Sequence, residues 1–164
     1  MAEGTGGMVA LYSRAGKLLV AYNKILVAID LGKTSSSVIS RAAGLAVAGR
    51  SELHVLHAVE PLSITYGGDI PMDFSSIQDE IYQQATEQLA AFCRDLDIPA
   101  EQQHLVMGRP EVEIASMAET LGADLIVMGS HERHGLAVLL GSTTDGVLHS
   151  AGCDMLAVKV NTEN

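Results

Sequence analysis

Two glycine-containing segments of the sequence could bind an anion. Residues 129–135 (GSHERHG) follow an apolar run, and residues 141–143 (GST) precede a stretch of helical character. Small residues at the start of a helix leave backbone N–H groups accessible, and both these groups and the helix dipole attract negative charge. The combination indicates a phosphate site, although glycines after strands are equally compatible with plain turns.

A carboxylate, Asp30, closes another apolar run. In an open parallel sheet, ligands bind beyond the carboxyl ends of the strands, at the point where the strand order reverses. If both runs are strands of such a sheet, Asp30 and the glycine-containing segments lie at strand ends where one ligand could contact both.

A P-loop and nucleophilic catalysis are both disfavoured. Residues 32–34 (GKT) resemble the end of a P-loop, but the glycine that a P-loop needs five positions before Gly32 is Val27. Ser142 and Thr143 have no histidine or aspartate at a recognisable supporting spacing. We therefore expect no catalytic residue and a protein that is not an enzyme.

Histidines suggest a metal site only superficially. His131 and His134 are three residues apart in a loop with no fourth ligand indicated, and His54 and His57 point to opposite faces of a strand. For His131, a place in a pocket wall and a plain loop position are equally compatible with the sequence. We expect no bound metal at these histidines.

Short apolar runs alternate with longer helical patterns from residue 23 onward. A continuous apolar run, such as 25–29, is typical of a strand buried on both faces, and repeated strand–helix alternation predicts an α/β protein with a parallel sheet covered on both sides. The expected strands are 25–29, 53–59, 104–107, 124–128 and 154–160. Four helices are expected: from the Ser/Thr cluster at 34–37 to about 48, along 77–96, from 110 to 121, and from 142 or 143 to 151. The helix along 77–96 is expected to bury Ile77, Ile81, Ala85, Leu89, Phe92 and Leu96 on one face.

Composition and charge restrict the classes of partner and the class of protein. The chain has 164 residues, 48% of them hydrophobic and 18% charged, with a net charge of −10. This charge argues against nucleic acid and against an anionic membrane surface. No run approaches the ~20 apolar residues of a membrane helix, and two cysteines are too few for a disulfide framework. We expect a cytoplasmic protein.

The first 21 residues differ from the rest. They contain glycines at positions 4, 6, 7 and 16, and no small-residue cleavage site follows their apolar run. We interpret residues 1–21 as a flexible leader or a remnant of cloning, and residues 22–164 as one domain.

The C-terminal third resembles universal stress proteins. The resemblance is carried by VMGSH at 127–131, GL at 135–136, LLGST at 139–143, VL at 147–148 and AGCDMLAV at 151–158, and the opening ILVAID at 25–30 is similar to that family's first strand. It covers about residues 23–160. The resemblance implies an open, doubly wound, Rossmann-like sheet of five parallel strands in the order 3-2-1-4-5, with helices on both faces.

The resemblance also implies a nucleotide site, since family members often bind ATP or AMP. By position, Ala28 and Asp30 would contact adenine together with Val55 or Leu56. Met128, Gly129, Ser130 and His131 would meet the ribose and first phosphate, and Gly141, Ser142 and Thr143 would donate to phosphate oxygens. Family members commonly form homodimers through the last strand, here between Met155 and Val160.

One position departs from the family's nucleotide-binding pattern. Glu132 replaces its second glycine, and eight rather than nine residues separate Glu132 from Gly141. This shorter loop resembles the UspA-like subgroup, some of whose members do not bind ATP. A carboxylate ~5 Å from a phosphate charge costs about 3 kcal/mol at an effective dielectric of 20. We therefore expect AMP or adenosine to be preferred over ATP, unless Mg²⁺ bridges Glu132 to the phosphates.

Three functions remain open from the sequence. The first is a dimeric binding module that senses an adenine nucleotide through its 130–140 loop and signals to protein partners that the sequence does not identify. The second is a dimeric interaction protein of the same fold with an empty pocket, and the third is a weak ATPase.

Overall fold

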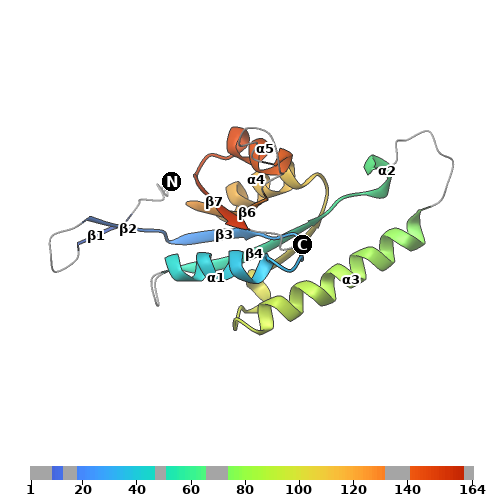
Figure 1. Ribbon diagram of the computed structural model, residues 1–164, viewed down its shortest axis with the longest axis horizontal. Coiled ribbons are helices and arrows are strands. Elements are labelled where there is room, and N and C mark those ends of the chain that lie inside the picture. The colour runs from blue at the N-terminus through green and yellow to red at the C-terminus, as the bar shows by residue number, and fades with distance from the viewer. Residues whose placement is uncertain (1–8, 13–17, 47–50, 66–73, 132–140, 161–164) are drawn as a thin grey trace, which may run out of the picture.

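The computed structural model describes residues 9–12, 18–46, 51–65, 74–131 and 141–160. Its centre is a five-stranded parallel sheet with the strand order β5-β4-β3-β6-β7 (Figure 1). The strands are β3 (Lys24–Ala28), β4 (Glu52–Val59), β5 (Gln103–Met107), β6 (Leu125–His131) and β7 (Asp154–Val160). Counted along the five strands of this sheet, the order is 3-2-1-4-5, which confirms the predicted topology.

Helices cover both faces of the sheet, as predicted (Figure 1). One face packs against α1 (Ser35–Leu45) and α3 (Ser75–Arg94), the other against α4 (Pro110–Leu121) and α5 (Ser142–Ser150). Between β4 and β5 the chain also forms the short α2 (Leu62–Thr65) and a 3₁₀ turn at Ala100–Gln102. The apolar β3 residues alternate between the two resulting cores, because successive strand side chains point to opposite faces.

Two helices differ from the sequence-based expectation. The first, α1, ends at Leu45 rather than near 48, and residues 47–50 lie outside the described part of the chain. In α3, Ala85 and Leu89 are buried as expected, but Ile77 is 48% exposed, and Leu96, beyond the helix end, is 38% exposed. The first turns of α3 extend past the sheet (Figure 1), so the apolar stripe is longer than the surface that can cover it.

Residues 9–12 and 18–21 form strands that the sequence did not lead us to expect. β1 (Val9–Tyr12) pairs antiparallel with β2 (Leu18–Ala21) in a two-stranded sheet separate from the main one. Both segments are short apolar runs, which suits strand formation. That residues 22–164 make up the domain remains a prediction.

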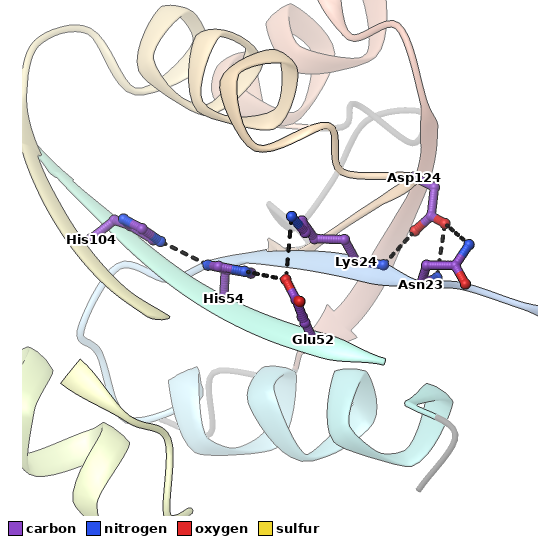
Figure 2. A network of polar contacts seen from close by, with 6 residues as sticks. All are labelled: Asn23, Lys24, Glu52, His54, His104 and Asp124. Carbon is purple, nitrogen blue, oxygen red and sulfur yellow. Dashed lines mark hydrogen bonds and ion pairs between the residues drawn. The ribbon is translucent and has the colours of Figure 1, made fainter. Parts of the chain in front are cut away.

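Asp124 joins the beginnings of the two central strands, β3 and β6 (Figure 2). Its carboxylate accepts hydrogen bonds from the N–H of Asn23 at 2.8 Å, from the N–H of Lys24 at 3.0 Å and from the Asn23 side-chain amide at 3.2 Å. The Asp124 N–H in turn donates to the Lys24 carbonyl at 3.0 Å. One side chain thus satisfies the backbone donors at the start of β3, which fixes where that strand begins.

Two histidines on neighbouring strands share a direct ring contact (Figure 2). His54 Nδ1 of β4 lies 2.9 Å from His104 Nε2 of β5, and the rings stack with centroids 5.2 Å apart. His54 Nε2 lies 3.4 Å from Glu52, whose carboxylate also pairs with Lys24 at 3.2 Å. One of the two facing nitrogens must accept the bond, so at most one of them carries a proton.

This contact predicts an acid-dependent loss of stability. Burial, and then the charge of His54, lower the pKa of His104 below its usual 6.5. Below about pH 6.5 the unfolded chain therefore binds more protons than the folded chain. The contribution of neutral His104 to the free energy of unfolding is complete above about pH 6.5 and is lost as the pH falls through the lowered pKa of His104 in the folded state. We expect the urea-unfolding free energy to decline below about pH 6.5 in the native protein and to decline less in His104→Gln, which cannot take up this proton. Identical profiles would contradict the assignment.

Candidate functional site

A cavity opens at the carboxyl ends of the central strands. Its volume is about 840 Å³, within the 300–1,000 Å³ typical of ligand pockets. It is lined by residues of β3, β4 and β6 and of the loops and helices that follow the strands: Ala28, Ile29, Asp30, Thr34, Ser35, Val38, Leu56, His57, Ala58, Pro110, Ile114, Met128, Gly129, Gly141, Ser142, Thr143, Thr144 and Asp145. Asp30 and the Gly141–Thr143 segment, far apart in sequence, therefore border one cavity.

Asp30 is held in place by the turn that leaves β3. Its Oδ1 accepts hydrogen bonds from the Gly32 N–H at 2.8 Å and the Ser35 hydroxyl at 2.9 Å. Leu31, between Asp30 and Gly32, adopts a left-handed conformation with φ 60°, which costs a residue other than glycine about 1–2 kcal/mol. This strained turn fixes the carboxylate at the cavity wall before any ligand arrives.

The N-terminus of α5 also borders the cavity. Gly141 is the N-cap, and its carbonyl accepts the first intrahelical bond from the Asp145 N–H at 2.9 Å. The N–H groups of Ser142, Thr143 and Thr144 precede that bond, so the helix itself offers them no acceptor. Three amides and the positive end of the helix dipole therefore border the cavity, which suits an anion.

The position of α5 depends on close packing against α4. A Cβ placed on Gly146, in the middle of α5, would come within 2.8 Å of Glu111 Cβ. Only glycine allows the two helices to approach this closely. The approach brings the first turn of α5 to the cavity, where Pro110 at the start of α4 also lies.

Most of the predicted site residues line the cavity. Those that do are Ala28, Asp30, Met128, Gly129, Gly141, Ser142 and Thr143. Val55 does not: it is fully buried in the core between the sheet and α1 and α3, and its neighbour Leu56 lines the cavity instead. Ser130 is not among the lining residues. The side chain of His131 and all of residues 132–140, including Glu132, lie outside the described residues.

Sequence reasoning missed the contribution of the β4 terminus. His57 and Ala58 line the cavity directly after Leu56, and His57 Nδ1 lies 2.8 Å from the Ile29 carbonyl oxygen. The signal was available, because ligands bind at the carboxyl ends of parallel strands and both residues are near the end of β4. Asp145 also lines the cavity and was not predicted. It lies in the first turn of α5, directly after the predicted Gly141–Thr143 segment.

Neither cysteine is part of the cavity wall. Cys93 and Cys153 are both free, and burial raises the pKa of Cys93 to about 11.

Over the described part of the chain, no three His, Cys, Asp or Glu side chains are grouped so as to hold a metal ion. None of the described helices is both long and apolar enough to cross a membrane.

Comparison with known proteins identifies similar chains. The family model described as "Universal stress protein family" matches residues 21–159. Universal stress protein A homolog 1 of Coxiella burnetii is 39% identical over 138 residues, covering 84% of this chain and 96% of its own. The solved structure of MJ0577, from Methanocaldococcus jannaschii, matches with a TM-score of 0.71 and 25% identity over 88% of this chain and 100% of its own. UspA from Lactobacillus plantarum, at 20% identity and a TM-score of 0.65 over 85% and 99%, shares the fold.

Proposed function

Because this chain belongs to the universal stress protein family, we propose that it is an adenine-nucleotide-binding module that responds to AMP or ATP. One observation carries the proposal: the Asp30 turn and the amides at the start of α5 border the same 840 Å³ cavity. A nucleotide has a neutral, hydrogen-bonding base at one end and an anion at the other. The cavity wall offers partners for both: a carboxylate at Asp30 and backbone N–H groups at the start of α5.

The base would lie against β3 and β4. Aliphatic side chains of these strands line the cavity, Ala28 of β3 and Leu56 of β4, and they suit the faces of a purine ring. The Asp30 carboxylate, held by Gly32 and Ser35, presents acceptor oxygens toward a ring amine or a ribose hydroxyl.

The phosphates would lie at the start of α5, with Gly141, Ser142 and Thr143 donating backbone N–H groups. The carboxylate of Asp145, in the first turn of α5, also lines the cavity. Carboxylate oxygens are ligands that Mg²⁺ accepts together with substrate phosphates, so Asp145 fits a magnesium ion that enters with ATP.

We further propose that the protein binds rather than transforms its ligand, and that it acts as a homodimer in the cytoplasm. The outer edge of β7 supports the dimer: β7 ends the sheet, and Leu156 is 36% exposed there. An edge strand presents backbone groups that a second copy can pair with. The free cysteines are consistent with a reducing compartment.

Thermal unfolding with nucleotide tests the proposal. At 100 times Kd a ligand stabilises the folded state by about 2.7 kcal/mol, which raises the Tm of a chain of this size by roughly 5–11 °C. We expect AMP and ATP to produce such a shift and GMP to produce a much smaller one at the same concentration. If no nucleotide changes the Tm, the pocket is empty and the protein acts through its surface alone. Release of phosphate from Mg²⁺–ATP in a turnover assay would instead support a weak ATPase.

A further inference from the structure

The hydrogen-bond ladder between β3 and β4 ends at the cavity, and a side chain takes the place of its next bond. The Ile29 N–H donates to the Leu56 carbonyl at 3.0 Å, and the paired register stops at Ala28 and Leu56. In a continuing parallel ladder the next bond would run from the Ala58 N–H to the Ile29 carbonyl. Instead, His57 Nδ1 lies 2.8 Å from that carbonyl. A carbonyl only accepts hydrogen bonds, so Nδ1 carries the proton.

Because His57 occupies the Ile29 carbonyl, the Ala58 peptide groups face the cavity. The N–H and C=O of alternate strand residues point to the same neighbour, and Leu56 uses its carbonyl toward β3. Ala58 therefore also points toward β3, whereas Val59 points the other way and accepts from the Gly108 N–H at 3.0 Å. Because β3 has already ended, Ala58 presents a donor and an acceptor side by side to the cavity that it lines.

We propose that His57 is a positioning residue: by occupying the Ile29 carbonyl, it keeps the Ala58 N–H, beside the Ala58 C=O, available to the base of the ligand. The ligand half of this inference rests on the proposed function. Adenine offers the complementary pair, a ring N1 that accepts and an amino group that donates. Hypoxanthine, with a protonated N1 and a 6-oxo group, offers the reverse pair. His57 thereby selects for a 6-amino purine through the Ala58 N–H.

Two substitutions separate positioning from packing. His57→Asn places an amide nitrogen where Nδ1 lies and can still donate to Ile29, whereas His57→Leu cannot. In His57→Leu the Ala58 N–H is expected to bond to the Ile29 carbonyl, so its hydrogen exchange should slow by at least about tenfold. In His57→Asn it should exchange as in the native protein. An unchanged exchange rate in a folded His57→Leu would overturn the proposal whether or not nucleotide binds.

Ligand affinity provides the second measurement. His57→Leu should weaken AMP binding by about tenfold, the effect of one lost hydrogen bond. It should have little effect on 1-deaza-AMP, which has a C–H in place of N1 and cannot accept from Ala58. His57→Asn should restore native AMP affinity. Equal losses for AMP and 1-deaza-AMP would overturn the positioning role. A native protein that binds neither compound would refute the proposed function, while the exchange experiment would still test His57.

Discussion

Replacement of Asp124 by alanine is expected to lower the free energy of unfolding by about 3 kcal/mol, because it removes the acceptor of several hydrogen bonds at once. The Asp124 carboxylate accepts from two backbone N–H groups, of Asn23 and Lys24, and from the Asn23 side chain (Figure 2). Hydrogen bonds to a charged acceptor contribute about 1.5–3 kcal/mol, and backbone donors left without a partner add a desolvation cost. The bonds are only partly buried, which keeps the total below the simple sum.

Urea unfolding of three variants measures this effect. Asp124→Asn keeps one acceptor oxygen and should lose about half as much stability as Asp124→Ala. Asp79→Ala removes an exposed carboxylate from the outer surface of α3 and should change stability by less than about 0.5 kcal/mol. If Asp124→Ala were as mild as Asp79→Ala, Asp124 would not fix the start of β3.

The fold class could be predicted because strands buried on both faces are continuous apolar runs in the sequence. The segment 25–29 (ILVAI) is apolar at every position, which requires cover on both faces of the strand, and in the structure Ile25 and Leu26 face opposite cores. Alternation of such runs with helices restricts the topology to few arrangements. The helix limits were less certain, since α3 is apolar along more of its length than the sheet can cover.

A strand that is apolar on both faces is easy to predict, but its sequence does not indicate which residues face the site. In the β4 segment 53–59 (LHVLHAV) both faces are apolar, so the sequence does not indicate whether Val55 or Leu56 points toward the cavity side. The answer depends on the register with β3, where Ala28 pairs with Leu56. The early end of the ladder at His57 is equally invisible, because it depends on where β3 turns away.

The largest effect on ligand binding is expected from Gly141→Asp, and it should be opposite in sign to the effect on stability. Gly141 has φ −53° and ψ 156°, a conformation open to any residue, and a Cβ there would meet no atom within 4 Å. Aspartate is a preferred N-cap, so the helix should gain a few tenths of a kcal/mol. The new carboxylate would accept from the amides that the phosphate needs and repel the phosphate by about 3 kcal/mol per charge at ~5 Å. AMP affinity should therefore fall about 100-fold or more.

Calorimetry with AMP and adenosine isolates the phosphate contribution. Gly141→Asp should affect adenosine binding little, because adenosine lacks the anion. Gly141→Asn supplies a neutral cap of the same size and should cost AMP about tenfold, through competition for the amides alone. Gly152→Ala, also with open space around its Cβ but outside this cavity, should bind AMP normally. Since Gly141→Asp is expected to unfold no more easily than the native protein, a lost affinity cannot come from misfolding. Unaltered AMP affinity would mean that the phosphate lies elsewhere and that the amides of α5 have another role.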